Sequence, residues 1–426
     1  MDVDGDKAAV LARTRDHVAP HRVQVWDAFG TQLVMGRREG YRMWDLSGHE
    51  LLDFHLNGGT FNLGHRNPEV IDALVRALDE VDIGNHHFAS ADRAALAERL
   101  AACAPGPMPF SVFASGGSEA IDVAIKTARR ATGRRRILGL DAGYHGKTGL
   151  SGAAGADAGA RFFHSDLPDD FATVPFADAD AVERALAAGG FAAVIMETVP
   201  ATYGFPVVPE GYLAAVKAAA ERHGALYIAD EVQTGLGRTG GLWGVQAHGV
   251  EPDIMVTGKG LSGGIYPIAA TLVRDEHAGW LHEYGWGHVS TFGGSELGCR
   301  VAAAVLEITQ RPETVANVRH LIARYADGLA AIAAEEPYLV EVRASGLVIG
   351  LRVDHPDGAI YLQQELYGLG LWAIASGYDQ SVLQFKPGLL LADAEVDRSL
   401  ELLAEGLRRA KTADRPVPSR HPKPRT

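Results

Sequence analysis

The middle of the chain alternates short apolar runs with amphipathic stretches, and this alternation restricts the possible folds more than any other feature of the sequence. The apolar runs are continuous rather than interrupted by polar residues, which is typical of strands buried on both faces of a parallel sheet. Because helical patterns separate these strands, the sequence predicts an α/β fold whose ligand site lies at the carboxyl ends of the strands. The strands are expected over residues 110–115, 135–140, 192–198, 225–230 and 253–258, with helices over 119–130 and 211–223.

The two ends of the chain combine a few short strands with longer helical patterns. We expect a large domain over residues 66–310, with its central sheet mainly parallel and flanked by helices, and a small α+β domain formed by residues 1–65 and 311–412. Residues 413–426 are rich in proline and basic residues, and we expect them to be disordered. The elements expected in these flanks are an N-terminal helix within 1–30, two strands around the Ser47-Gly48 turn, a helix from Pro68, a helical region over about 301–335, two strands within 338–353, a strand through "LQFKPGLLL" (383–391) and a closing helix over 394–410.

Composition and charge argue against several classes of protein. The 426 residues are 47% hydrophobic and 22% charged, as in ordinary globular proteins. A formal net charge of −13 argues against a nucleic-acid or anionic-membrane binder, and no apolar segment approaches the roughly 20 residues that span a bilayer. Two cysteines make no disulfide framework, the His86-His87 pair lacks further metal ligands, and the N-terminus lacks a signal-peptide pattern. We therefore expect a cytoplasmic protein without a metal site, a nucleic-acid partner or a membrane partner.

Four of the expected strands end at residues with specific chemistry. The strand that ends at Ser115 is followed by a glycine turn and a helix, whose N-terminal N–H groups suit a phosphate. The next strand leads to Tyr144, and the two strands further along the chain lead to Asp230 and Lys259. Each residue alone has an ordinary interpretation: a solvated turn for Lys259, a helix cap for Asp230 and packing for Tyr144.

Their joint occurrence at neighbouring strand ends points to pyridoxal 5′-phosphate. A lysine amine forms a Schiff base with the cofactor's aldehyde. A carboxylate opposite the pyridine nitrogen keeps that nitrogen protonated, so that the ring acts as an electron sink. An aromatic side chain packs on the ring, and the glycine turn holds the phosphate. Asp230 is followed directly by Glu231, for which the sequence suggests no role.

The sequence resembles the class III pyridoxal-phosphate aminotransferases of fold type I, from about Asp45 to Arg409. The resemblance implies a transaminase that takes an amino group from an amino-acid donor and passes it to a carbonyl acceptor in a ping-pong cycle. It also implies a homodimer with each active site at the subunit interface. The matching blocks are "IADEVQTGLGRTG", "PDIMVTGKGLSGGIYPIAA", "NLGHRNPEVIDAL", "SGGSEAIDVAIKTAR", "GYHGKTG" and "STFGG".

The resemblance assigns roles around the cofactor ring. Lys259 would form the Schiff base and carry the proton between the substrate's α-carbon and the cofactor. Asp230 would pair with the pyridine nitrogen, and Gln233 would bind the phenolic oxygen. Val232 would pack on one face of the ring and Tyr144 on the other.

Further roles concern the phosphate and the substrate. Gly117 and Ser118 would hold the phosphate, and Thr291 would reach the phosphate of the partner subunit. Glu197, at the end of its strand, matches a family glutamate near the substrate.

Three residues depart from the family pattern near the expected substrate site. Gln384 stands where many relatives have an arginine that clamps the α-carboxylate, and glutamine cannot make that bidentate charged contact. Lys386, on the same strand face by alternation, could supply a point charge instead. Lys147 replaces a family arginine, and Thr202 replaces the glutamate that neutralises the clamp. We therefore expect one substrate to lack an ordinary α-amino-acid carboxylate, as in specialised biosynthesis.

Other functions remain open at the level of sequence. The same cofactor and fold also serve aminomutases, decarboxylases and phospho-lyases, because the broken bond depends on the orientation of the substrate. A catalytically silent binding module is disfavoured because Lys259 and Asp230 are both present. A dinucleotide-binding dehydrogenase is weaker still, because "SGGSEA" lacks the Gly-x-Gly-x-x-Gly order.

Overall fold

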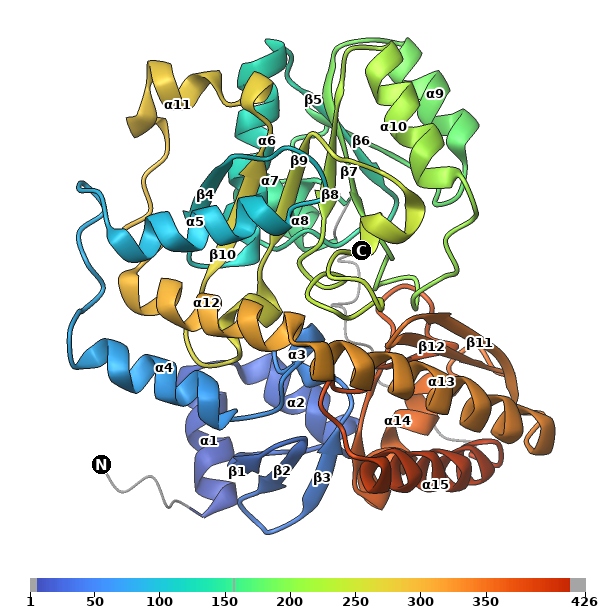
Figure 1. Cartoon of the computed structure of the whole chain (residues 1–426). Helices are drawn as coiled ribbons and strands as arrows, with labels where there is room; N and C mark the ends of the chain where they lie inside the picture. The colour runs from blue at the N-terminus through green and yellow to red at the C-terminus, as the bar shows by residue number, and fades with distance from the viewer. Residues whose placement is uncertain (1–5, 156–157, 414–426) are drawn as a thin grey trace.

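The computed structural model describes residues 6–155 and 158–413, and Figure 1 shows a central sheet in its upper half with two smaller sheets below. The central sheet has seven strands in the order β4-β10-β9-β8-β7-β5-β6. β10 is antiparallel to both of its neighbours, and the remaining pairs are parallel. The strands are β4 (Phe110–Ala114), β5 (Arg136–Leu140), β6 (Phe171–Val174), β7 (Phe191–Glu197), β8 (Leu226–Asp230), β9 (Ile254–Thr257) and β10 (Ala269–Val273).

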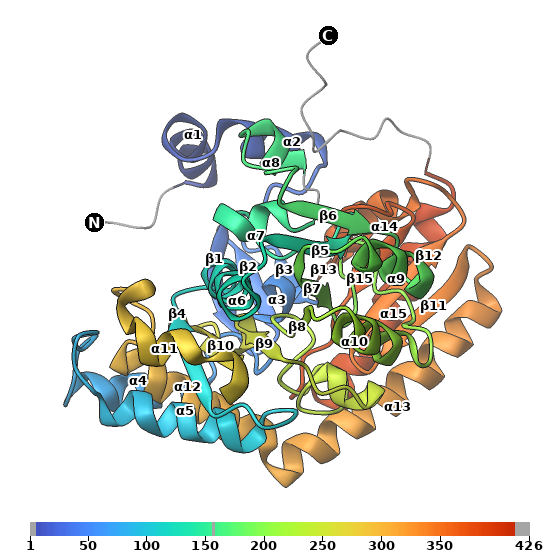
Figure 2. The ribbon, with the colours of Figure 1, turned by 90° about the horizontal axis from the view of Figure 1, so that it is seen from above.

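Five of these strands confirm the expected ones to within one or two residues at each end, whereas β6 and β10 were not expected. Both faces of the sheet are covered, which explains the continuous apolar runs. Along β7, Ala193 and Ile195 face one core and Val194 and Met196 face the other. Figure 2 shows α6 and α7 on one side of the sheet and α5, α9 and α10 on the other. These helices are α5 (Ala91–Cys103), α6 (Gly117–Thr132), α7 (Gly149–Ala153), α9 (Ala179–Ala187) and α10 (Tyr212–Arg222).

The two smaller sheets join the ends of the chain. One has the order β1-β2-β3-β13, in which the C-terminal strand β13 lies parallel to β3, and the other has the order β11-β12-β15-β14. One hydrophobic core contains side chains from both ends, including Phe54, Tyr325 and Phe385. The strands are β1 (Met35–Glu39), β2 (Arg42–Asp45), β3 (Glu50–Asp53), β11 (Leu339–Ser345), β12 (Val348–Val353), β13 (Leu371–Trp372), β14 (Ile374–Ala375) and β15 (Val382–Phe385).

The remaining helices surround these sheets. The helix from Pro68 begins as expected, because the Asn67 side chain caps it by accepting from the N–H groups of Glu69 and Val70. The helices are α1 (Lys7–His17), α2 (Pro20–Ala28), α3 (Leu56–Gly59), α4 (Pro68–Leu78), α8 (Ala158–Phe162), α11 (Gly279–Glu283), α12 (Glu296–Gln310), α13 (Pro312–Glu335), α14 (Gly358–Leu369) and α15 (Asp393–Ala410), with short 3₁₀ helices over Gly244–His248, Lys259–Ser262, Asp275–His277 and Gly285–Gly287.

Of the expectations for the C-terminal part, one is confirmed and one was wrong. The helical region over 301–335 is present as two helices, because Pro312 starts a new one after Arg311. The expected strand over 383–391 ends at Phe385, because Pro387 has no N–H group to donate and the Lys386 N–H donates to Phe54 O instead. The expected disordered tail lies almost entirely outside the described residues. Among the described residues, no helix is long and apolar enough to cross a membrane.

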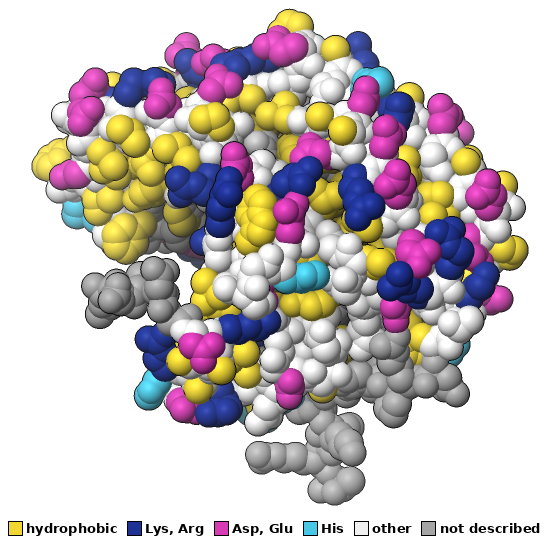
Figure 3. Space-filling view, turned by 90° about the horizontal axis from the view of Figure 1, so that it is seen from below, with side chains coloured by type: hydrophobic (Ala, Val, Ile, Leu, Met, Phe, Trp, Pro, Cys, Tyr) yellow, Lys and Arg dark blue, Asp and Glu magenta, His cyan; other side chains and the backbone are white. Residues whose placement is uncertain are grey.

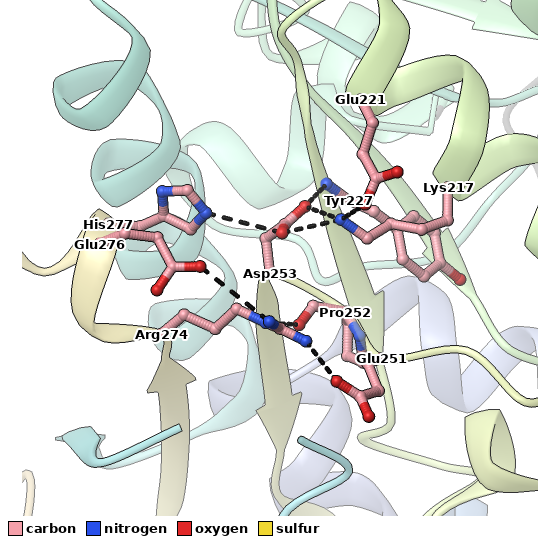
Figure 4. A network of polar contacts seen from close by, with 9 residues as sticks. All are labelled: Lys217, Glu221, Tyr227, Glu251, Pro252, Asp253, Arg274, Glu276 and His277. Carbon is pink, nitrogen blue, oxygen red and sulfur yellow. Dashed lines mark hydrogen bonds and ion pairs between the residues drawn. The ribbon is translucent and has the colours of Figure 1, made fainter. Parts of the chain in front are cut away.

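The buried carboxylate of Asp253 holds the amino ends of β8 and β9 together (Figure 4). Asp230 lies at the opposite end of β8. Asp253 accepts from the Tyr227 N–H at 2.8 Å and from Lys217 Nζ at 2.8 Å, and His277 Nε2 lies 3.5 Å away. Burial opposes its ionisation, but the bonds from His277, Lys217 and Tyr227 outweigh burial and lower the pKa of Asp253. This network stabilises the sheet that positions the site at the opposite strand ends.

Candidate functional site

One cavity at the carboxyl ends of the central strands brings together most of the residues that the sequence singled out. Its lining comes from the loops after β4, β5, β7, β8 and β9. The lining residues are Gly117, Ser118, Tyr144, His145, Gly146, Glu197, Val199, Asp230, Val232, Gln233, Thr234 and Lys259. A larger and more open cleft, lined by Tyr203, Arg343 and Tyr378 among others, contains neither Lys259 nor Asp230. The chemistry therefore resides in the smaller cavity.

Lys259 follows β9 directly and is held in an unusual backbone conformation, with φ of 42°. Burial lowers the pKa of its amine, and the charges of Asp230 and Glu197 oppose this only in part. A lowered pKa increases the neutral fraction of the amine, which is the form that attacks a carbonyl or accepts a proton.

Gly58, which the sequence analysis did not single out, lies against this lysine. A Cβ atom there would lie 3.1 Å from Lys259 Cε and 3.2 Å from Gln233 Oε1, and the φ of Gly58 is +71°. The left-handed backbone favours glycine there, and a larger residue would force the Lys259 or Gln233 side chain to shift.

Asp230 ends β8 and is held by two donors. His145 Nδ1 donates to Asp230 Oδ2 at 2.8 Å, and the Val232 N–H donates to Oδ1 at 3.0 Å. Burial opposes protonation of the imidazole, but the hydrogen bond and charge of Asp230, with the charge of Glu197, outweigh burial and raise the pKa of His145. A protonated His145 donates a charge-assisted hydrogen bond that holds the Asp230 carboxylate in position at the end of β8.

His145 is a functional residue that sequence reasoning missed. Its only signal was its place beside Tyr144 in the "GYHG" block.

Glu197 ends β7 beside Asp230 and is bonded to backbone groups. Its carboxylate accepts from the Tyr144 N–H at 2.9 Å and from the Ala201 N–H at 3.2 Å. Burial, with the nearby charge of Asp230, raises the pKa of Glu197, although His145 and the two N–H groups act in the opposite direction. Glu197 thus links the end of β7 to the loop that carries the aromatic ring.

Glu231, the acid that follows Asp230, is not among the residues that line the cavity, and both of its carboxylate oxygens accept hydrogen bonds. It accepts from the hydroxyls of Thr198 and Thr234 at 2.5 and 2.8 Å, and from the N–H groups of Gly244 and Val245 at 2.9 and 2.8 Å. Its role is structural: it fixes the segment after β8 against the 3₁₀ helix that begins at Gly244.

The loop after β4 and the loop after β5 approach each other where a phosphate would bind. The N-terminus of α6, at Gly117 and Ser118, opens into the cavity. A Cβ atom at Gly146 would lie 2.2 Å from Ser118 Oγ, so the two loops can meet only with glycine there. An anion seat, a carboxylate and a buried amine in one cavity fit pyridoxal 5′-phosphate.

Comparison with known proteins decides the family. The model of the class-III aminotransferases matches residues 26–407. The chain belongs to this family. It is 46% identical over 398 residues to an uncharacterised aminotransferase of Archaeoglobus fulgidus, covering 93% of each chain. The chain is therefore a pyridoxal-phosphate-dependent transaminase of fold type I, as the sequence predicted.

Solved structures agree on the fold. A transaminase from the marine bacterium Virgibacillus superposes with a TM-score of 0.88 at 23% identity, covering 95% of this chain and 99% of that chain. The ornithine aminotransferase of Toxoplasma gondii gives 0.85 at 24% identity, covering 96% of each. N-acetylornithine aminotransferase of Stenotrophomonas maltophilia gives 0.77 at 29% identity, covering 91% and 98%.

The residues expected at the substrate end of this aminotransferase are only partly brought together. Lys386 Nζ donates to Gln384 Oε1 at 2.8 Å, and Gln384 Nε2 donates to Ala201 O at 2.7 Å. The two side chains therefore point to the same side of the chain, although Lys386 follows the last residue of β15. Lys386 is fully buried, and burial together with the charges of Arg238 and Lys259 lowers its pKa well below the usual value.

Neither Gln384 nor Lys386 is among the residues that line the cavity, and the other expected residues lie outside the lining as well. The Thr202 hydroxyl donates to Ala142 O at 2.5 Å, and Lys147 Nζ lies 5.7 Å from the centre of the Tyr144 ring. Thr291 is exposed and contributes nothing to this cavity within the single chain. Among the described residues, no group of three or more His, Cys, Asp or Glu side chains could hold a metal ion.

Proposed function

We propose that this aminotransferase moves an amino group from an amino-acid donor to the carbonyl of a specialised biosynthetic substrate. The observation that carries the proposal is the pairing of Gln384 with Lys386, which leaves a neutral amide where an arginine clamp is expected. A neutral amide binds an α-carboxylate less strongly than a guanidinium does. An acceptor without that carboxylate, such as an amine precursor, an amino sugar or a heterocycle, suits this site better.

The cofactor, when bound, supplies an electron sink for the carbon that carries the amino group. Lys259 would hold its aldehyde and, as a neutral amine, would move a proton between that carbon and the cofactor's C4′ atom, in opposite directions in the two half-reactions. Asp230, supported by His145, would hold the proton on the pyridine nitrogen. Asp230 is buried, whereas Lys259 is partly buried and faces the cavity, where it could reach a bound cofactor.

The remaining side chains of the cavity would orient the cofactor. Gln233 would bind the phenolic oxygen, and Val232 and Tyr144 would pack against opposite faces of the ring. Gly117 and Ser118 would bind the phosphate. All five residues line the cavity, which supports these roles.

The anchor for the donor's carboxylate is proposed to be Lys386 or Lys147, with Glu197 and Thr202 at the edge of the substrate site. Lys386 is held by Gln384 and gains a proton most easily when an anion binds beside it. Lys147 is exposed, and its Nζ lies 5.7 Å from the centre of the ring of Tyr144, a residue that lines the cavity.

A substrate screen tests the proposal. Amino donors are added singly to the holoenzyme, and the loss of cofactor absorbance and the formation of pyridoxamine phosphate are followed. Acceptors with and without an α-carboxylate are then ranked by kcat/KM. Fast turnover only with ordinary pairs of α-amino and α-keto acids would refute the substrate proposal. Release of carbon dioxide or phosphate in place of amino transfer would point to a decarboxylase or phospho-lyase.

We further propose that the enzyme is a cytoplasmic homodimer with the domain division expected from the sequence. Figure 3 shows hydrophobic side chains gathered at the left of the face seen from below. Two segments with exposed apolar residues lie side by side, since the rings of His87 and Trp286 are 4.9 Å apart and the Glu296 N–H donates to Ile83 O. Their exposed large apolar residues are Ile83, Phe88, Tyr284, Trp286, Val289 and Phe292. A patch of this kind suits a second copy of the chain.

Mixed dimers test whether Thr291 serves the partner's site. Lys259→Ala and Thr291→Ala subunits are each nearly inactive alone if the role is correct. In a mixed dimer, the site that keeps Lys259 receives an intact Thr291 from the other subunit. Recovery of activity on mixing supports the shared site, and no recovery despite verified mixed dimers contradicts it.

A further inference from the structure

The segment after β7 touches the loop that carries Tyr144 through two adjacent hydroxyl groups. Thr202 Oγ1 donates to Ala142 O at 2.5 Å, and the Tyr203 hydroxyl donates to the carbonyl of Asp141. The two acceptors are consecutive residues of the turn that follows β5. Two neighbouring side chains thus donate hydrogen bonds to two neighbouring carbonyl groups.

The same segment is fastened on its other side to the C-terminal sheet. Its carbonyl groups accept three hydrogen bonds: from Gln384 Nε2 to Ala201 at 2.7 Å, from the Tyr378 N–H to Thr202 at 2.9 Å, and from Arg343 Nη1 to Tyr203 at 3.1 Å. Residues 201–203 therefore bridge the C-terminal sheet and the turn after β5.

The turn that carries Tyr144 needs such support. Ala142 has φ of 54°, a left-handed conformation that is disfavoured for alanine. Tyr144 itself is 39% exposed, so burial alone does not fix its ring. The Glu197 carboxylate holds the Tyr144 N–H from one side, and the two hydroxyl groups hold the preceding residues from the other.

We propose that Thr202 and Tyr203 are positioning residues that set the Tyr144 ring against the cofactor and couple its position to the C-terminal sheet. The inference rests on the proposed packing of Tyr144 on the cofactor ring. Thr202 then acts through the backbone of the turn, because its single hydroxyl proton is already donated to Ala142 O.

Tyr203 acts from outside the cavity. Its ring packs against Phe176 and Tyr378, with centroids 5.9 and 4.9 Å away, and it lines the open cleft rather than the Lys259 cavity. Packing against these two rings therefore explains the position of Tyr203 without any contact to the substrate.

Isosteric variants test the proposal. Thr202→Val and Tyr203→Phe each remove one donated hydrogen bond and preserve the shape of the side chain. One net hydrogen bond corresponds to about fivefold in an equilibrium constant. We expect each variant to weaken pyridoxal phosphate binding to the apoenzyme about fivefold, and the double variant about 25-fold if the two act independently. The visible circular dichroism of the bound cofactor should change as well.

Matched controls separate positioning from general stability. Thr202→Ser keeps the hydroxyl, and Tyr378→Phe alters the neighbouring exposed tyrosine but not its backbone bond; both should bind cofactor like the wild type. Unchanged cofactor affinity and dichroism in Thr202→Val and Tyr203→Phe would overturn the proposal. So would an equal loss in the two controls, or a fall in apoenzyme melting temperature that accounts for the weaker binding. Tyr144→Ala is measured alongside: if it leaves cofactor binding intact, the role of Tyr144 fails, and the positioning proposal fails with it.

Discussion

Replacing Glu231 by glutamine tests whether this buried acid is structural. The carboxylate accepts four hydrogen bonds, one from a hydroxyl and one from a backbone N–H at each oxygen. An amide keeps one oxygen and presents an NH₂ group to the other two donors. The threonine hydroxyl on that side can rotate and accept, but the backbone N–H of Gly244 or Val245 cannot.

One buried N–H group is therefore left unsatisfied in either orientation of the amide. Leaving a buried donor unpaired costs about 1–3 kcal/mol, and exchanging charged for neutral acceptors adds to that loss. We expect Glu231→Gln to reduce the free energy of unfolding by about 2–3 kcal/mol on the same reasoning. The structure places no reacting atom beside Glu231, so kcat should fall far less than it does in Asp230 variants.

Urea unfolding of the holoenzyme, followed by tryptophan fluorescence, measures the change in stability, and steady-state kinetics on the folded fraction measures kcat. Glu210→Gln is the matched control, because Glu210 is exposed and has no role in the site. A Glu231→Gln protein that is as stable as the control would refute the structural role. A fully folded variant that loses activity as severely as Asp230→Asn would show that Glu231 acts in the chemistry.

Three further perturbations follow from the same geometry. Asp230→Asn should fold and bind cofactor but react at least about 100-fold more slowly, because a neutral partner does not hold the proton on the pyridine nitrogen; near wild-type single-turnover rates would contradict this. Gly58→Ala should reduce the rate of the Lys259-dependent half-reaction, because the added methyl group lies 3.1 Å from Lys259 Cε; unchanged kinetics would show that the lysine moves freely. Asp253→Asn should cost up to about 3 kcal/mol, because the largely buried Lys217 keeps only the exposed Glu221 as a charge partner, and an unchanged urea midpoint would count against that network.

The pKa of Asp253 also gives a pH dependence with a definite sign. Its pKa is lower in the folded protein than the usual 3.8. Its contribution to stability is therefore complete above pH 3.8 and is lost as the pH falls through the lowered folded value. Wild-type protein should lose this contribution in acid, whereas Asp253→Asn should show a flatter profile of stability in that range.

The sequence predicted the strand ends of the central sheet well because both faces of that sheet are buried. The apolar runs that end at Glu197, Asp230 and Thr257 are dictated by burial, and parallel strands bring their carboxyl ends to one edge. Lys259, Asp230 and Tyr144 could therefore be expected in one place. The strand β10 was not predicted. Its antiparallel direction could not have been predicted either, because nothing local in a run of buried residues reveals the direction in which a strand pairs.

Residues whose roles depend on tertiary contacts could not be read from the sequence. Gly58 and His145 act through contacts with Lys259 and Asp230, which are distant in the chain. Glu231 looked like half of an acidic pair until its four donors were known. Thr202 was expected at the substrate, and no local pattern could show that its hydroxyl proton goes to a backbone carbonyl of the loop after β5.

The central claim is that Lys259 carries the proton in amino transfer within this cavity. The measurement that tests it most directly is a single-turnover half-reaction, in which an amino donor is added to the holoenzyme and to Lys259→Ala, and cofactor absorbance and pyridoxamine phosphate are followed together. The wild type should convert its cofactor stoichiometrically. Lys259→Ala should bind both cofactor and donor yet form product at least about 1,000-fold more slowly, because the substitution removes both the amine that transfers the proton and the group that forms the Schiff base. Conversion by Lys259→Ala at a rate near that of the wild type would contradict the account.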